Sequence, residues 1–225
     1  MLLKQGSVVA VGRDRVVSER SDNKSFWNRY AKLYDFEIKR FNGRAYFEMY
    51  QLMSSSLLPA MDVLEVATGT GSIAINIASS VRSVEAVDFS PKMIEVARKK
   101  KAPSNVRFSI EDATMLSFED NTFDAAIISN ALHIVPDPVK VLRNISRVLK
   151  PKGLLIAPTY SQGHLRDSTW NLNAKILKFI GFKTYSKWNP TEYVTFIEKN
   201  GFWVERWQVL PAAFPLVYLE AHKSE

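Results

Sequence analysis

Apolar and polar positions alternate in blocks between residues 63 and 157, and the blocks predict strands and helices in turn. Short apolar runs, typical of strands, occupy residues 63–66, 84–88, 106–110, 123–129 and 154–157. Between most of them, apolar residues recur at spacings of three and four, as on one face of a helix. Alternation of this kind predicts a parallel sheet with right-handed crossovers and helices on both faces.

Two of the predicted helices have recognisable first residues. Ser90 is a suitable N-cap and Pro91 a suitable first helical residue, so a helix is expected from there through Lys100. Pro138 opens another helix, and its inward-facing residues are predicted to be Val139, Leu142, Ile145 and Leu149.

The N-terminal part of the chain follows a different pattern. Residues 1–22 are polar, mixed in charge and weakly periodic, which predicts a mobile arm. Helical spacing begins at Ser25, and a second helical segment is expected after Asn42-Gly43. Residues 23–58 are therefore predicted to form a helical cap, whose second segment has on its apolar side Phe47, Tyr50, Leu52 and Met53.

The C-terminal part of the chain no longer alternates between strands and helices. Two helical patterns in residues 160–200 predict a lid over the substrate, and strand-like runs follow at 202–209 and 216–221. Their connection is too short for a parallel return, so the two strands must be antiparallel. We expect a single α/β domain over residues 23–225, with its core at 61–159 and a seven-stranded, mostly parallel sheet.

Composition narrows the possible chemistry. The 225 residues include no cysteine, which excludes disulfides, thiolate metal sites and cysteine nucleophiles. No apolar stretch approaches the roughly 20 residues that span a bilayer. Charged residues such as Lys4 and Arg13 interrupt any signal-peptide core, so a cytoplasmic protein is expected.

The net charge of +7 raises the question of a nucleic-acid partner. The densest basic run, Arg98 to Lys101, ends a predicted helix, where cations complement the helix dipole. Solvated helix faces therefore explain the charge better than a nucleic-acid footprint. Binding to an anionic membrane surface is left open.

A glycine-rich turn after the first predicted core strand carries the strongest functional signal. Residues 63–72 read as an apolar run, an acid and then a turn with Gly69 and Gly71, and Asp88 ends the next strand seventeen residues beyond Gly71. Glycines let a ligand approach the backbone closely, and a carboxylate can accept hydrogen bonds from both ribose hydroxyls. This arrangement predicts a nucleoside-binding site.

The nucleoside is at first ambiguous, because Gly69-Thr-Gly71-Ser-Ile-Ala74 also fits a dinucleotide pattern. Two observations argue against a nicotinamide cofactor. The chain has no Tyr-x-x-x-Lys pair to handle a proton, and its terminal antiparallel pair differs from a second mononucleotide-binding half.

Residues 63 to about 159 resemble the class I S-adenosylmethionine-dependent methyltransferases in five segments that occur in the family's order. The segments are Glu65-Val-Ala-Thr-Gly69-Thr-Gly71, Val87-Asp-Phe-Ser-Pro-Lys-Met93, Glu111-Asp-Ala113, Asn121-Thr-Phe-Asp124 with Ser129-Asn-Ala-Leu-His133, and Pro136-Asp-Pro138 with Leu149-Lys-Pro-Lys-Gly153. Tyr30-Ala-Lys-Leu-Tyr34-Asp35 is similar to an N-terminal helix that folds over the cofactor in one branch. That branch methylates quinone precursors, phospholipid headgroups and other small metabolites.

The resemblance implies a Rossmann-like fold and S-adenosylmethionine as cofactor, bound by Glu65, Ala67, Thr68, Gly69, Gly71, Asp88, Phe89, Met93, Asp112, Ala113, Ser129 and Tyr34. Ala67 replaces a glycine usual in the family, so the loop is expected to lie slightly farther from the ligand. Glu65 is assigned either to the methionine ammonium or to capping local backbone amides. Phe89 and Met93 either flank the adenine or pack in the core, and Asp112 either accepts from the adenine amino group or is a surface carboxylate.

Methyl transfer from a sulfonium needs mainly alignment and exclusion of water, and a base only if the acceptor arrives protonated. The candidates for acting on the acceptor are His133, Asn130 and Tyr30; His133 is either a base or a structural histidine. The three histidines suggest no metal site. Several aromatic residues either surround an apolar acceptor or pack in the core: Tyr30, Tyr34, Tyr160, Trp170, Trp188 and Tyr193.

The expected partner is a small-molecule methyl acceptor, and the expected assembly is a monomer or homodimer. Ser129-Asn-Ala-Leu stands where enzymes that methylate base amines carry Asp-Pro-Pro-Tyr or Asn-Pro-Pro-Tyr, which argues against a nucleic-acid substrate. A nicotinamide-dependent oxidoreductase and a non-catalytic protein that binds S-adenosylmethionine are the alternatives.

Overall fold

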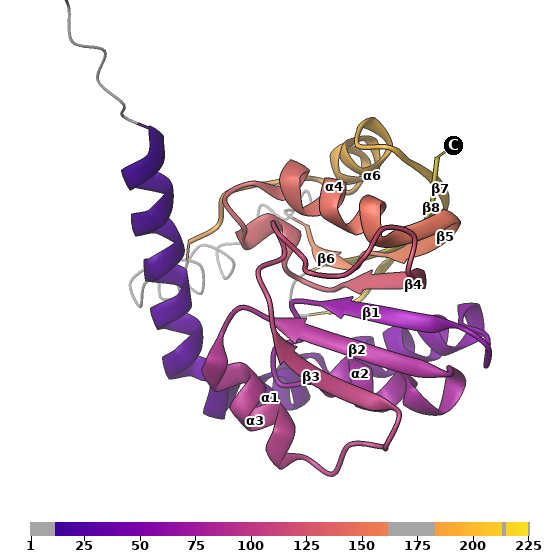
Figure 1. Ribbon diagram of the computed structural model, residues 1–225, viewed down its shortest axis with the longest axis horizontal. Coiled ribbons are helices and arrows are strands. Elements are labelled where there is room, and N and C mark those ends of the chain that lie inside the picture. Colours follow the sequence, from indigo (N-terminus) through magenta and orange to yellow (C-terminus); the bar gives the residue numbers. More distant parts are fainter. Residues whose placement is uncertain (1–11, 162–182, 213–214, 225) are drawn as a thin grey trace, which may run out of the picture.

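The computed structural model describes residues 12–161, 183–212 and 215–224 (Figure 1). Its parallel strands lie side by side in the order β3 (Val106–Ile110), β2 (Ser83–Asp88), β1 (Asp62–Val66), β4 (Phe123–Ile128) and β5 (Leu149–Ile156). These are the five core strands that the apolar runs predict. Because the chain order reverses between β1 and β4, the carboxyl ends of these two strands flank the position where α/β sheets bind ligands.

The sheet is completed by antiparallel strands. β8 (Leu216–Lys223) pairs antiparallel with β5, with the short β6 (Thr159–Tyr160) and with β7 (Phe202–Leu210). The predicted antiparallel pair of terminal strands is therefore confirmed. Within the described residues the sheet has eight strands rather than the expected seven, because β6 continues the path of β5 along β8.

Helices cover both faces of the sheet, as expected (Figure 1). One hydrophobic cluster contains α4 (Pro138–Val148) and α6 (Pro190–Lys199), and the other contains α2 (Ser72–Ile77) and the C-terminal part of α1 (Gly12–Ser56). Alternate residues of β1 divide between them: Leu64 belongs to the first cluster and Val63 to the second. The remaining described helices are α3 (Pro91–Lys99) and the 3-10 helices η1 (Ala78–Ser80) and η2 (Leu132–Ile134).

The predicted helix starts are confirmed by their capping bonds. The Ser90 hydroxyl accepts from the Met93 amide at 3.2 Å, with Pro91 as the first helical residue. Asp137 caps α4 in the same way, since its carboxylate accepts from the Lys140 amide at 2.9 Å.

The N-terminal helix differs from the prediction. One continuous helix, α1, runs through Asn42-Gly43 and begins at Gly12, inside the segment expected to be a mobile arm. Glycine in a helix interior costs only about 1 kcal/mol. Burial of Met49 and Met53 beyond it offsets that cost, and an anchored helix extends by one hydrogen bond for each added residue. Residues 1–11 and most of the predicted lid, residues 162–182, lie outside the described part of the chain.

Two predicted helix faces are partly wrong. Phe47 and Val139 point to solvent, although both were expected to face inward. Beyond Gly43, the buried stripe of α1 consists of Ala45, Tyr46, Met49 and Met53; in α4 it consists of Val141, Leu142, Ile145 and Val148. Because Phe47 and Val139 are apolar, the prediction counted them as inward-facing and so placed each apolar face about one residue away from the observed one.

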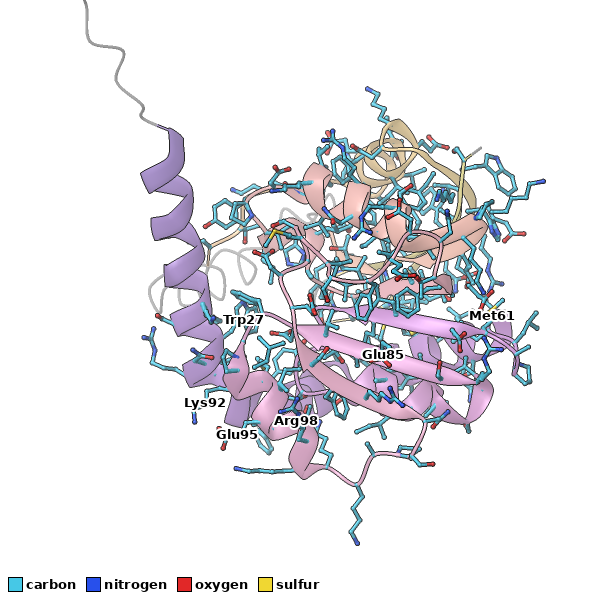
Figure 2. All side chains as sticks on the ribbon, viewed as in Figure 1. Trp27, Met61, Glu85, Lys92, Glu95 and Arg98 are labelled. Atoms are coloured by element: carbon cyan, nitrogen blue, oxygen red, sulfur yellow. The ribbon has the colours of Figure 1, made fainter. Side chains whose placement is uncertain are left out.

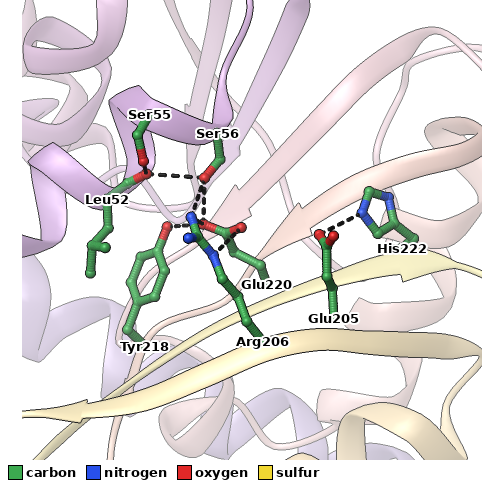
Figure 3. A network of polar contacts seen from close by, with 8 residues as sticks. All are labelled: Leu52, Ser55, Ser56, Glu205, Arg206, Tyr218, Glu220 and His222. Carbon is green, nitrogen blue, oxygen red and sulfur yellow. Dashed lines mark hydrogen bonds and ion pairs between the residues drawn. The ribbon is translucent and has the colours of Figure 1, made fainter.

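A buried polar network joins the end of α1 to the terminal strands (Figure 3). The carboxylate of Glu220 is 2% exposed; it accepts from the Ser56 hydroxyl at 2.7 Å and from Nε of Arg206 at 2.8 Å. The Tyr218 hydroxyl donates to the same carboxylate. Because every partner belongs to α1, β7 or β8, this network fixes the helix relative to the sheet.

Along the described residues, no helix is both long and apolar enough to cross a bilayer.

Candidate functional site

A cavity opens at the carboxyl ends of the parallel strands, and α1 contributes to its lining. It encloses about 940 Å³, part of it open to solvent. Trp27 projects from α1 toward the core (Figure 2) and lines the cavity together with Tyr34. The other lining residues are Val66, Ala67, Gly69, Val87, Asp88, Phe89, Met93, Glu111, Asp112, Ala113, Thr114, Ser129, Asn130, Ala131, Ile134, Val135, Pro136 and Val141.

Most of the predicted cofactor residues meet at this cavity. The lining includes ten residues that the sequence proposed: Tyr34, Ala67, Gly69, Asp88, Phe89, Met93, Asp112, Ala113, Ser129 and Asn130. It does not include the predicted residues Tyr30, Glu65, Thr68, Gly71 and His133. The residues that sequence reasoning missed are mostly apolar and come from several elements, such as Trp27 on α1 and Val141 on α4. Ile134 and Val135 lie between two segments that the sequence did single out.

The glycine-rich turn is held in left-handed conformations. The φ angles of Ala67, Gly69 and Gly71 are 57°, 56° and 77°. The Thr68 amide donates to the Val87 carbonyl at 2.9 Å, which ties the turn to β2. Ala67 and Gly69 therefore present backbone to the cavity, as a nucleoside cradle requires.

Gly71 is needed for a different reason. A Cβ on this residue would lie 2.5 Å from the ring of Phe108 and 3.2 Å from Cβ of Ala97. The side-chain-free position therefore allows the turn to pack on β3 and α3 and is not explained by contact with a ligand.

The left-handed conformation of Ala67 leads to a stability prediction. An L-residue with a Cβ is disfavoured there by about 1–2 kcal/mol, and the greater flexibility of unfolded glycine offsets part of this. Ala67→Gly should therefore raise the free energy of unfolding by about 1 kcal/mol in chemical denaturation. Lys152→Gly is the matched control away from the cavity, because Lys152 has a φ of 60°. A loss of stability in Ala67→Gly would contradict this account of the turn.

Asp88 is oriented toward the cavity by the backbone. The residue is 5% exposed. Its Oδ2 accepts from the Gly69 amide and its Oδ1 from the Ser90 amide, both at 2.9 Å. Each oxygen retains lone-pair capacity for a further hydrogen bond. Burial raises the pKa of the Asp88 carboxyl to about 6, and the two backbone amides oppose that rise.

Glu65 lies behind the turn rather than on the cavity lining. Its Oε2 accepts from the Thr68 hydroxyl at 2.6 Å and from the Ala74 amide at 2.8 Å, which is the capping role that the sequence allowed. Burial raises the pKa of the Glu65 carboxyl to about 8, although both of these hydrogen bonds oppose the rise.

This raised pKa predicts how stability changes with pH. Because the folded pKa of about 8 exceeds the value of 4.5 expected when unfolded, the stabilisation is fully present below about pH 4.5 and is lost as pH rises through 8. Glu65→Gln should remove about 2 kcal/mol of the decline in unfolding free energy between pH 6 and pH 9. Denaturant titrations of both proteins across this range measure the difference. Parallel curves for the two proteins would show that Glu65 does not titrate in this way.

Asn130 lies at the end of β4 and faces the cavity. Its φ of 53° turns the chain after the strand. Its side-chain amide donates to the Tyr46 hydroxyl at 2.9 Å and accepts from the Tyr160 amide at 3.0 Å, so its orientation is fixed.

An ion-pair cluster that the sequence did not predict ties α1 to the glycine-rich turn. Asp35 accepts from the hydroxyls of Thr70 and Ser72, and its other oxygen lies 2.6 Å from Nζ of Lys100. The same stretch of α1 places Trp27 and Tyr34 on the cavity. The helix is therefore held beside the cavity, where it can cover a ligand.

Among the described residues, no group of three acidic, cysteine or histidine side chains is placed to hold a metal ion.

Comparison with known proteins identifies the core. Residues 64–157 match the family model described as a methyltransferase domain. This segment therefore carries a methyltransferase domain. It is 34% identical over 152 residues to the demethylmenaquinone methyltransferase of Renibacterium salmoninarum, an alignment covering 66% of this chain and 62% of that protein. The chain thus covers less than two thirds of that relative's length.

Solved structures share the fold of this chain. A putative methyltransferase described in complex with the Trm112 activator of Haloferax volcanii superposes with a TM-score of 0.71 at 16% identity, covering 88% of this chain and 98% of that one. The cyclase SpnF superposes with a TM-score of 0.65 at 20% identity, covering 79% and 80%. At these identities the likeness concerns architecture alone.

His133 has the contacts of a structural histidine. The residue is buried, and its Nδ1 is 2.9 Å from the Thr159 hydroxyl. Burial lowers the pKa of the imidazole to about 4, so the ring is neutral at physiological pH and a weak base. Its backbone carbonyl also accepts from the amides of Tyr185 and Ser186. These contacts favour the structural role that the sequence left open.

The aromatic residues that the sequence proposed around an acceptor lie partly at the cavity and partly in the core. Tyr193 is fully buried and donates to the Ala157 carbonyl at 2.8 Å, while Trp188 stacks on Phe196 in the same hydrophobic cluster. Tyr30 packs against the rings of Phe26, Trp27 and Tyr34, so it supports the lining indirectly. Trp170 lies outside the described residues.

Proposed function

We propose that this chain transfers a methyl group from S-adenosylmethionine to a small, largely apolar acceptor. The observation that carries the proposal is the Asp88 carboxylate, which ends β2 on the cavity and is oriented by two backbone amides. The methyltransferase-domain match over residues 64–157 supports the choice of donor over a nicotinamide.

The residues around the cavity fit a nucleoside with an amino-acid tail. A Cβ on Gly69 would be 3.6 Å from the Tyr34 ring, which is an ordinary contact, so the φ of 56° rather than a lack of space favours glycine there. Asp88 would hold the ribose hydroxyls, and the apolar side chains of Phe89 and Met93 would flank the base. Asp112, which accepts from the Thr114 amide and hydroxyl through Oδ1, would face the adenine amino group beside Ala113.

The turn from Ala67 to Gly69 and the neighbouring Ser129 would contact the methionine part. Glu65 lies one layer deeper and would act on the ammonium through Thr68 or water rather than directly. When bound, S-adenosylmethionine supplies an electrophilic methyl group on a positively charged sulfur.

The protein's own contribution is alignment and exclusion of water. Trp27 and Tyr34 cover the cavity from α1. Asn130 would orient the acceptor with an amide that Tyr46 and Tyr160 hold in place. Because His133 is neutral and bonded to Thr159, the acceptor would have to lose its proton before or without the help of that side chain.

The acceptor is proposed from the relatives and the lining. The similar proteins from Renibacterium salmoninarum and Staphylococcus aureus are named demethylmenaquinone methyltransferases. A flat, apolar quinol suits the many apolar side chains around the cavity. A naphthoquinol lacking one ring methyl is therefore the first acceptor to test.

The experiment has two parts. Calorimetric titration with S-adenosylmethionine, its demethylated product and NADH should give binding of the first two and none of the third. Methyl-labelled donor should then yield a labelled product with the naphthoquinol. Binding of NADH alone would overturn the proposal in favour of an oxidoreductase. Donor binding with no labelled product from any quinol, phospholipid or cell-extract acceptor would favour a non-catalytic binding protein.

A further inference from the structure

Helix α1 presents two chemically different faces. Trp27 and Tyr34 line the cavity, and farther along the helix Tyr46 and Met49 are buried against the core. On the other side, large apolar side chains point to solvent: Phe36 is 69% exposed and Phe47 is 64% exposed. Two exposed phenylalanines on one helix call for an explanation, because burial of each ring would be favourable.

The two phenylalanines are arranged together with arginines. Residues 29, 36, 40 and 47 are separated by seven, four and seven positions, which places them along one side of a helix. Arg44 lies one helical turn beyond Arg40. The exposed residues of this group, called the Phe-Arg face below, are Arg29, Phe36, Arg40, Arg44 and Phe47. The two rings are about 16 Å apart along the axis, at 1.5 Å per residue.

We propose that the Phe-Arg face docks on an anionic lipid surface, with α1 lying along the headgroups. Helices that bind membrane interfaces combine aromatic side chains, which enter the boundary between headgroups and acyl chains, with arginines that pair with anionic headgroups. The protein's net charge of +7 adds long-range attraction. Glu48, which is also exposed, lies beside Phe47, and the arginines outnumber it among the described side chains of this face.

This assignment fits better than a compact protein interface. Protein interfaces concentrate their aromatic anchors in one desolvated centre. Here the rings are separated by three helical turns, with arginines between and beside them. A lipid surface accepts such a spaced arrangement because headgroups move to meet each charge.

Docking through this face has a structural consequence. The helix that touches the lipid is also the helix that closes the cavity, and Asp35 ties it to the glycine-rich turn. An apolar acceptor that leaves the bilayer would reach the cavity by passing around α1, whose opposite side lines it. The docking itself does not depend on the proposed methyl transfer, because it can be measured without donor or acceptor.

The test is sedimentation of the full chain with vesicles of phosphatidylcholine alone or of phosphatidylcholine and phosphatidylglycerol in equal parts. Strong binding is expected only with phosphatidylglycerol, and raising the salt from 0.1 M to 0.5 M should weaken it. Arg40→Gln with Arg44→Gln should lower the partition coefficient about tenfold or more, since each arginine near an anionic surface contributes roughly fivefold. Phe36→Ser with Phe47→Ser should lower it by about tenfold.

The matched control removes the same charge elsewhere. Lys140→Gln with Arg143→Gln changes two exposed cations on α4, away from α1, and should leave most of the binding intact. Thermal unfolding of each variant shows that it folds. Equal losses in the α1 and α4 charge variants, or no binding to phosphatidylglycerol, would overturn the proposal. A dimer in sedimentation equilibrium that is lost in Phe36→Ser with Phe47→Ser, without vesicle binding, would assign the face to a second copy of the chain instead.

Discussion

Gly71→Ala is expected to lower the free energy of unfolding by about 3 kcal/mol, or roughly 6–12 °C in Tm for a chain of this length. Two effects add. The φ of 77° disfavours any residue with a Cβ by about 1–2 kcal/mol. The added Cβ would also lie 2.5 Å from the Phe108 ring, and relieving such overpacking costs about 1–3 kcal/mol. Denaturant unfolding followed by circular dichroism measures the sum.

Two other glycines separate these effects. Gly201 has a φ of 87° but nothing within 4 Å of an added Cβ, so Gly201→Ala measures the backbone cost alone. Gly43 lies in α1 with open space around it, and Gly43→Ala should stabilise the protein by about 1 kcal/mol through helix propensity. Adding Phe108→Leu to Gly71→Ala replaces the ring with a smaller side chain and should restore part of the lost free energy of unfolding. If Gly71→Ala costs no more than Gly201→Ala, the contact with Phe108 is not what requires glycine.

The sequence predicts the sheet well because its strands carry local signals. β1 and β4 are short apolar runs, and both sides of β1 are buried, so no alternation was needed to recognise it. Ser90 and Asp137 act through bonds to amides three residues away, and such short-range devices are readable from the sequence. The position of Asp88 follows from the same local logic, since an acid that ends a central strand lies at the carboxyl edge.

What the sequence could not predict depends on contacts between distant segments. Gly71 resembles a ligand-binding glycine in the motif, but its neighbour Phe108 comes from β3. His133 lies in η2, shortly after β4, yet its partner Thr159 is 26 residues away. Asp35 was part of a recognised segment, but its contact with Lys100 joins α1 to the end of α3. In each case the missing information was which side chain would fill the space opposite.

Asp88→Ala is expected to weaken binding of S-adenosylmethionine and its demethylated product about a hundredfold. Under the proposed function the carboxylate accepts from both ribose hydroxyls, and hydrogen bonds to a charged group contribute about 1.5–3 kcal/mol each. The variant also leaves the Gly69 and Ser90 amides without their carboxylate acceptor, which loosens the turn. Calorimetric titration at pH 7.5 measures the affinity. Asp120→Ala, which removes an exposed carboxylate paired with Arg147, is the matched control and should bind as the unchanged protein does.

The pH dependence of binding distinguishes a direct role of Asp88 from a general loss of fold. Burial raises the pKa of this carboxyl to about 6, so the charged, accepting form predominates above pH 6 and is lost below it. Affinity of the unchanged protein should therefore be constant between pH 7 and 8 and fall by up to about tenfold for each pH unit below 6. In Asp88→Ala that dependence should disappear while the weak residual binding persists. If the variant keeps both the affinity and the acid-side decline, the group that titrates is another one, and the ribose hydroxyls must be held elsewhere in the cavity.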